Sequence, residues 1–414
     1  MAELQANGTC RPPRPEESIK IESDQLVPLN GQYVMKVAEP MSEVIYLDKL
    51  LLIVVDHPAD VHVYPDERFV SSGAPASQDL LAFRETIFPV KARDHRGHDV
   101  TQKLRAWDRD TVDQFRQRAW LGYAEEHWVE LDFGDRLAKV SPQTPLVLCM
   151  AGWTDYPYPE SIWAATQAGI ELKPPVLERL GPDGQWQTLV ADAGFPAGLP
   201  RLMTLDVTGK LAGPACKLRL RTNMQVFWDQ IFVAPLLERV PADPLGRHEK
   251  KSGIFRAVSL PVSKATLETR GCPQEYSPDG RRPTLYNYDR LDAVPVTHLS
   301  GKLTRTGDVT QLLHERDDRF VIFGPGDEVT VHFDAGKLAP LPRGWTRSFV
   351  LRTWGYSKDG GPFTATGDTI EPLPFHGMSK YPYGGDEHYP QDTAHQEYVR
   401  VFNTRQVGRP WFGK

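Results

Sequence analysis

The stretch FGPGDEVTVHFDA, residues 323–335, decides the fold class of this chain. A Gly-Pro-Gly turn opens it, and after the turn Val329, Val331 and Phe333 occupy every second position. Successive side chains of a β-strand point to opposite faces, so these three residues share one face. The stretch therefore predicts a strand that turns one apolar face toward the core of a sheet.

Similar runs of β-branched or aromatic residues, separated by turn residues, fill most of the chain. They lie at 33–37, 43–55, 61–64, 127–133, 145–150, 170–180, 185–190, 203–207, 217–220, 225–233, 258–262, 295–304, 320–323 and 348–352. Apolar residues at a helical spacing of three and four occur only in short segments, at 99–120 and 160–169. We expect a mostly-β protein of antiparallel β-sandwich units with a few short helices.

The length of 414 residues predicts more than one unit, because a single core stops growing at roughly 250 to 300 residues. We expect a flexible N-terminal arm at 1–28, which is rich in proline and charge, and a β-sandwich region at 29–240 with a helical insertion near 99–120. A linker at 241–257 then leads to a second β-rich region, 258–414, which ends in a long wrapping loop.

Two segments share one pattern. Residues 33–54 and 216–234 each contain an alternating strand, a short turn, an aromatic and a large apolar residue, an Asp and a second alternating strand. Convergent hairpins and a true duplication both explain the likeness. In either case Asp48 and Asp229 are expected at equivalent places on closing strands.

Charge and composition exclude some classes of partner. The formal net charge is −6, so nothing draws the chain as a whole to nucleic acid or anionic lipid. The longest apolar run, 50–55, is far shorter than the ~20 residues that cross a bilayer, so no membrane insertion is expected. The four cysteines, Cys10, Cys149, Cys216 and Cys272, show no CxxC spacing, which argues against a structural zinc site.

The standard catalytic motifs of hydrolases, metalloproteases and nucleotide-binding enzymes are absent from the sequence. Two histidine clusters are candidates for a divalent metal. His95 and His98 stand beside Asp94 and Asp99, although loop composition explains that cluster too.

The second cluster is the C-terminal run PFHGMSKYPYGGDEHYPQDTAH, residues 374–395. Imidazoles, carboxylates and phenols suit metal ligation or the recognition of sugar hydroxyls. Its candidate metal ligands are His376, Asp386 and His388, and its candidate ligand contacts are His376, Tyr381, Tyr383 and His388. A loop held down by Tyr and Pro packing has the same composition.

An aromatic loop, AGWTDYPYPESIW at 151–163, is the other candidate site. Sugar-binding β-sandwiches use aromatic faces for the C–H side of a pyranose and carboxylates for its hydroxyls. The candidate contacts here are Trp153, Asp155, Tyr156, Tyr158 and Trp163. The alternative is that these aromatics anchor the loop to the sandwich.

Four segments read together resemble a known family. They are RLMTLDVTGKLAGPACKLRLRTNMQVFWDQIFVA (201–234), VIYLDKLLLIVVDHPADVHVYPDERF (44–69), GDVTQLLHERDDRFVIFGPGDEVTVHFDA (307–335) and IEPLPFHGMSKYPY (370–383). From about Leu26 onward the chain resembles the C-terminal portion of large bacterial FG-GAP repeat proteins with an ASPIC/UnbV-type segment. The resemblance implies an exported or periplasmic protein and carries over no functional residue. The rhythm of 127–234 is also similar to galactose-binding-like jelly rolls.

We therefore expect a non-enzymatic β-sandwich protein that recognises a carbohydrate or protein partner. No cofactor is expected apart from a possible divalent metal. The alternative is a metal-dependent enzyme that uses the His/Asp/Glu/Tyr loop near the C-terminus, and a third reading is a structural piece of a larger polypeptide.

Overall fold

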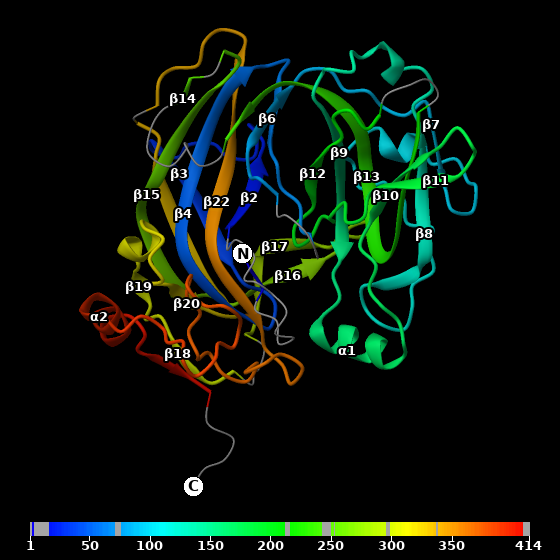
Figure 1. The fold of residues 1–414 in the computed structure, drawn as a ribbon. Helices are drawn as coiled ribbons and strands as arrows, with labels where there is room; N and C mark the ends of the chain where they lie inside the picture. Colours follow the sequence, from blue (N-terminus) through cyan, green and yellow to red (C-terminus); the bar gives the residue numbers. More distant parts are fainter. Residues whose placement is uncertain are drawn as a thin grey trace.

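A computed structural model describes residues 2–3, 16–70, 76–211, 216–241, 250–251, 253–294, 299–336 and 338–408. The described chain is mostly β, with long antiparallel strands arranged in two curled sheets that lie side by side (Figure 1). Within this part of the chain, none of the helices is long and apolar enough to cross a membrane.

The first sheet has ten strands, drawn from both ends of the chain. They are β1 (Ala2–Glu3), β2 (Glu16–Ile21), β3 (Gln32–Ala38), β4 (Glu43–Pro58), β14 (Lys250–Lys251), β15 (Arg256–Thr269), β19 (Gly307–Asp308), β20 (Val321–Phe323), β21 (Asp327–Asp334) and β22 (Trp345–Asp359). We call the described parts of 16–58 and 253–408 the split unit, because two separate segments build it.

The second sheet has nine strands and comes from one segment, 61–240, which we call the continuous unit. Its strands are β5 (His62–Pro65), β6 (Leu80–Phe83), β7 (Lys91–Asp94), β8 (Tyr123–Asp132), β9 (Leu146–Asp155), β10 (Val176–Leu180), β11 (Trp186–Val190), β12 (Arg201–Asp206) and β13 (Lys217–Val240).

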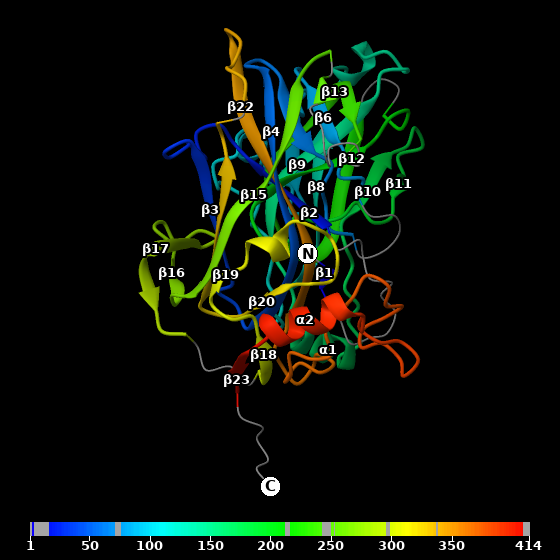
Figure 2. The same ribbon diagram turned by 90° about the vertical axis from the view of Figure 1, so that its left-hand side faces the viewer.

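Smaller elements complete the two units. They are the hairpin β16 (Cys272–Tyr276) and β17 (Leu285–Asp292), the pair β18 (Gly301–Leu303) and β23 (Arg405–Val407), the helices α1 (Pro159–Gln167) and α2 (Thr393–Val401), and the 3₁₀ turns Gln102–Leu104, Leu137–Lys139 and Thr310–Leu313. Figure 2 shows α2 at the lower end of the split unit, next to β18 and β23. The C-terminal segment therefore covers the end of the first sheet.

Strand pairing divides the chain differently from the expected boundaries at 29–240 and 258–414. β4 pairs with β22 along nearly its whole length, from Glu43 opposite Asp359 to Pro58 opposite Trp345. The expected arm, 1–28, contains strand β2, which pairs with the other side of β22; residues 1 and 4–15 lie outside the described residues. Local patterns identify strands, but the partner of β4 lies some 300 residues away, where no local pattern indicates it.

The helical insertion expected near 99–120 is reduced to the 3₁₀ turn Gln102–Leu104. Beyond it, several backbone N–H groups bond to β13 instead of forming helical hydrogen bonds. Val112 donates to the Trp228 carbonyl at 2.8 Å, and the N–H groups of Asp108 and Arg109 donate to the Asp229 carboxylate. Long-range pairing thus outweighs the helical spacing. The helix expected at 160–169 does form, as α1.

Alternation along β4 serves two cores at once. Leu50, Leu52 and Val54 pack inside the split unit. The intervening residues, Leu51, Ile53 and Val55, face the other way and pack against the start of the continuous unit. A strand buried on both faces reads as a continuous apolar run, which is the composition of β4. The two units are therefore joined by a shared apolar layer.

The two units also share one local motif. The sequence Asp-Val-Thr-Gln occurs at 99–102, after β7, and again at 308–311, after β15. In each copy the threonine hydroxyl oxygen accepts the N–H of a strand alanine at 2.8 Å, and the valine N–H donates to the same alanine's carbonyl at 3.1 Å. The alanines are Ala92 and Ala265. The same bonds at the same offsets identify 99–102 and 308–311 as equivalent.

The neighbouring strands extend this equivalence. β7 pairs with β8 as β15 pairs with β21, and the two halves of β13 pair with β8 and β9 as β3 and β4 pair with β21 and β22. The order along the chain differs, because β13 closes the continuous unit whereas β3 and β4 open the split unit. The units are therefore circularly permuted versions of one arrangement.

Candidate functional site

Each unit has a β-bulge with an aspartate at its extra position. In β4, Leu47 and Lys49 face Gly355 and Trp354, so Asp48 has no partner across the ladder. A bulge redirects the side chain of its extra residue. The aspartate is thereby turned toward the loop that follows the equivalent Asp-Val-Thr-Gln motif.

The counterpart in the continuous unit, Asp229, is fully satisfied. In β13, Trp228 and Gln230 face Gly152 and Ala151, which leaves Asp229 as the extra residue. Its Oδ1 accepts the N–H of Asp108 at 3.2 Å, and its Oδ2 accepts the N–H of Arg109 at 2.9 Å. Asp229 thus acts as a clamp on a loop.

In Asp48, only one of the two carboxylate oxygens accepts a loop N–H group. Its Oδ1 accepts the N–H of Asp317 at 3.2 Å, the same distance as in the other unit. Its Oδ2 is buried and has no hydrogen-bond partner, and the residue has no exposed surface. Burial raises the pKa of Asp48 to about 7, against the lowering effect of His376.

His376 faces this free oxygen. Its Nε2 lies 3.5 Å from Asp48 Oδ2 and has no hydrogen-bond partner. On the other side of the ring, Nδ1 forms a short hydrogen bond to Asp318 Oδ1, and the backbone N–H of His376 donates to the same oxygen at 2.9 Å. Asp318 therefore fixes the orientation of the imidazole.

A phenol closes the group. The ring of Tyr356, on β22, lies 6.0 Å from the His376 ring, and its hydroxyl is a third buried polar atom without a partner. The carboxylates of Asp318 and Asp48 disfavour ionisation of this phenol, so burial and these neighbours raise the pKa of Tyr356. We call Asp48, Asp318, Tyr356 and His376 the polar centre.

The loop that carries Asp318 is held from three sides. Asp48 bonds to Asp317 as described, Tyr389 donates a short hydrogen bond to the Asp318 carbonyl, and His395 Nε2 donates to the Asp317 carbonyl at 2.8 Å. Asp318 has φ of 66°, a left-handed value that costs free energy for a residue with a side chain. The fold therefore maintains this position of the Asp318 carboxylate against a local cost.

The predicted metal ligands of the C-terminal run are distributed differently. His376 enters the polar centre, whereas Asp386 and His388 are exposed. Among the described residues, the one group of His, Cys, Asp or Glu with ligand atoms within 4.8 Å of one another is Asp48, Asp318 and His376. The structure thus brings His376 together with Asp48 and Asp318, and not with Asp386 and His388.

The two predicted tyrosine contacts of this run are turned inward. The Tyr381 hydroxyl donates to the Pro372 carbonyl at 2.9 Å, and the Tyr383 hydroxyl donates to the Leu373 carbonyl at 3.2 Å. Both phenols therefore pin the C-terminal segment to itself, which is the packing alternative considered for this loop.

The cluster at 94–99 does not converge on one point. His98 Nδ1 lies 2.9 Å from Asp94, while His95 Nε2 lies 3.2 Å from Glu125. Asp99 caps the Thr101 N–H at 2.9 Å, as its equivalent Asp308 does for Thr310. The cluster is a set of turn contacts.

Most of the predicted aromatic loop anchors the chain. Trp153 donates from Nε1 to the Gly198 carbonyl at 2.9 Å, and Tyr156 stacks on Phe195 at 5.7 Å. Asp155 forms an ion pair with Arg282 of the β16–β17 hairpin at 2.5 Å. These contacts fasten the loop to the core and join the two units.

Trp163 is the exception. It lies on α1 with 53% of its surface exposed, and its ring is 5.1 Å from that of Phe363, which is 42% exposed. Phe363 belongs to the segment after β22, so each unit contributes one ring. Tyr158, which directly precedes α1, places its hydroxyl 3.3 Å from the sulfur of Met41. The result is an aromatic surface at the junction.

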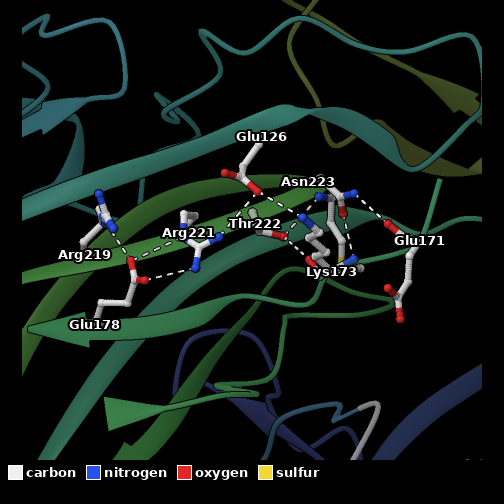
Figure 3. Close-up of polar contacts among 9 residues, drawn as sticks. Glu126, Glu171, Lys173, Glu178, Arg219, Arg221, Thr222 and Asn223 are labelled. Carbon is white, nitrogen blue, oxygen red and sulfur yellow. Dashed lines mark hydrogen bonds and ion pairs between the residues drawn. The ribbon is translucent and has the colours of Figure 1, made fainter. Parts of the chain in front are cut away.

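A charged network links two strands of the continuous unit (Figure 3). Glu178 pairs with Arg219 at 2.6 Å and with Arg221 at 3.0 Å, and Glu126 pairs with Arg221 and Lys173. Each basic group in Figure 3 faces a carboxylate. This network holds β10 on β13.

Sequence reasoning named His376 as a candidate ligand and Asp48 only as the counterpart of Asp229, and it did not name Asp318 or Tyr356. The signal for Asp318 is present in the sequence, because Asp317 and Asp318 stand nine and ten residues after Asp308, as Asp108 and Arg109 stand after Asp99. When the two Asp-Val-Thr-Gln motifs are aligned, Asp317 and Asp318 therefore fall at the positions of Asp108 and Arg109, in the loop next to each bulge aspartate.

Comparisons with family models, curated proteins and solved structures found no match.

Proposed function

We propose that this protein is a non-enzymatic recognition protein that binds a carbohydrate at Trp163 and Phe363. The observation that supports this function is the exposure of two adjacent aromatic rings, one from each unit. Exposed aromatic faces cover the apolar side of a pyranose, and nearby carboxylates accept its hydroxyl hydrogens. Burial raises the pKa of Tyr158, which directly precedes α1, and the carboxylates of Glu43, Asp359 and Asp155 raise it further.

The fold proposed for each unit is a jelly roll of the galactose-binding type. The long antiparallel strands of the two curled sheets support it. A carbohydrate ligand also fits the exported or periplasmic location that the resemblance to FG-GAP repeat proteins implies.

Glycan-array binding tests this function with the intact protein and the variants Trp163→Ala and Phe363→Ala. Loss of one stacking ring is expected to weaken binding about tenfold, which corresponds to roughly 1.4 kcal/mol. Trp107, with 41% of its surface exposed on the continuous unit, supplies the matched control Trp107→Ala. The proposal fails if the intact protein binds no glycan or if Trp107→Ala weakens binding as much as Trp163→Ala.

A metal-dependent enzyme is the second candidate function. The observation that favours it is the grouping of a nitrogen donor and two carboxylates in the polar centre. Hydrolytic turnover that requires an added divalent metal and disappears in Asp48→Asn would support it over simple recognition.

A further inference from the structure

The polar centre places two hydrogen-bond acceptors face to face. In the tautomer whose Nδ1–H is accepted by Asp318, Nε2 of His376 presents a lone pair. That lone pair is directed at Asp48 Oδ2, which has no hydrogen-bond partner. Two buried acceptors that face each other are satisfied when a proton or a metal cation lies between them.

The distance between the two atoms discriminates between a proton and a metal. A direct N–H···O hydrogen bond spans about 2.7 to 3.2 Å, and the Nε2 to Oδ2 distance is 3.5 Å. Two ligands at about 2.1 Å from a tetrahedral ion stand roughly 3.4 Å apart. The spacing therefore matches two ligands of one ion better than a shared hydrogen.

The groups around His376 and Asp48 are also consistent with a metal ion between these two residues. A carboxylate that accepts the other ring N–H of a histidine, as Asp318 does, is the usual arrangement behind a metal-bound imidazole. The ligand atoms of Asp48, Asp318 and His376 all lie within 4.8 Å of one another. An imidazole combined with carboxylates selects zinc-like ions over magnesium or calcium, which prefer oxygen ligands alone.

We propose that the polar centre binds a divalent transition-metal cation of the zinc type between Asp48 Oδ2 and His376 Nε2, with Asp318 as the carboxylate that orients the imidazole. Two protein ligands leave the other positions of the ion open to water or to a bound molecule, near the unpartnered hydroxyl of Tyr356. The site is separate from Trp163 and Phe363, and it does not depend on the proposed carbohydrate binding.

The second unit supplies an internal comparison. Asp229 stands at the equivalent bulge, but both of its carboxylate oxygens accept loop N–H groups, and Arg109 occupies the place of Asp318. The same backbone arrangement therefore occurs twice. In the continuous unit both oxygens of the aspartate accept loop N–H groups, whereas in the split unit one oxygen faces His376.

Titration of metal-depleted protein with Zn²⁺ alone, followed by calorimetry, tests the proposal. The intact protein is expected to bind one equivalent. Asp48→Asn is expected to bind at least about 100-fold more weakly because it removes a ligand, and Asp318→Gly about 10- to 100-fold more weakly because it removes the carboxylate that orients the imidazole. Glycine tolerates the left-handed backbone at 318, so the second variant should fold even if the first does not.

Two matched controls come from the continuous unit, Asp229→Asn and Arg109→Gly, the latter at a φ of 69°. Both should keep the affinity of the intact protein, as should His388→Gln. Substitution of Co²⁺ adds a spectroscopic check, since a tetrahedral N/O site gives visible absorption that Asp318→Gly should lose. The proposal is overturned if the intact protein binds no stoichiometric Zn²⁺, or if Asp48→Asn and Asp318→Gly both retain it.

Discussion

At the scale of single residues, Lys358 is the most unusual group outside the polar centre. It is completely buried at the end of β22 and donates to the Ile370 carbonyl at 3.1 Å and to the Tyr381 hydroxyl at 2.9 Å. Burial lowers the pKa of Lys358 from 10.5 to about 7, in spite of the nearby carboxylates of Glu371 and Asp368. The amine is therefore largely neutral in the folded protein above neutral pH.

This shift predicts how stability depends on pH. Between pH 7 and 10.5 the unfolded chain holds a proton on Lys358 that the folded chain has released, so its contribution to stability rises with pH. The free energy of unfolding of the intact protein, relative to Lys358→Met, should increase across this window by up to about 1.4 kcal/mol per pH unit. Urea denaturation at a series of pH values measures it, and parallel curves for the two proteins would refute it.

At the scale of elements, the two bulges depend on the glycines opposite them. A Cβ added at Gly355 would overlap the Tyr46 carbonyl oxygen, and one added at Gly152 would overlap the Phe227 carbonyl oxygen. Gly355 also has a φ of 152°, which L side chains rarely adopt. Each bulge that redirects an aspartate, Asp48 or Asp229, thus needs a glycine on the facing strand, because a side chain there would overlap the backbone.

Substitution of either glycine should therefore weaken its unit. Gly355→Ala and Gly152→Ala are each expected to lower the free energy of unfolding by about 2 kcal/mol or more, because backbone must move to admit a methyl group. Gly361→Ala is the control, since nothing lies within 4 Å of its added Cβ, and it should change stability by less than about 0.5 kcal/mol. Equal losses in all three variants, in chemical denaturation, would contradict this account of the bulges.

The element scale also shows what the sequence predicts well. Strict alternation at Val329, Val331 and Phe333 predicted β21, and the likeness of 33–54 to 216–234 placed Asp48 and Asp229 at equivalent positions. The helical spacing at 99–120 predicted helices that do not form, because N–H groups of this segment, such as those of Asp108 and Val112, bond to β13. A local sequence pattern contains no information about such distant partners. Asp386 and His388 were grouped with His376 by closeness in sequence, whereas the polar centre takes its partners from β4 and from the loop at 318.

At the scale of the whole molecule, one arrangement occurs twice with its strands in a different order along the chain. The expected region at 29–240 is divided between the two sheets, because β3 and β4 open the chain yet pair with β21 and β22 near its other end. Residues 242–249 and 252 of the expected linker lie outside the described residues. The continuous unit uses its bulge aspartate to clamp a loop. The split unit, covered by the C-terminal segment, frees one oxygen of the same aspartate and sets His376 against it.

Anomalous scattering at the zinc edge, from crystals of the Zn²⁺-loaded protein, tests this account most directly. We predict one strong peak about 2.0 to 2.2 Å from Asp48 Oδ2 and His376 Nε2, and no peak beside Asp229. A peak at His388 and Asp386 instead, or equal density at the two bulge aspartates, would contradict the division of roles between the two units.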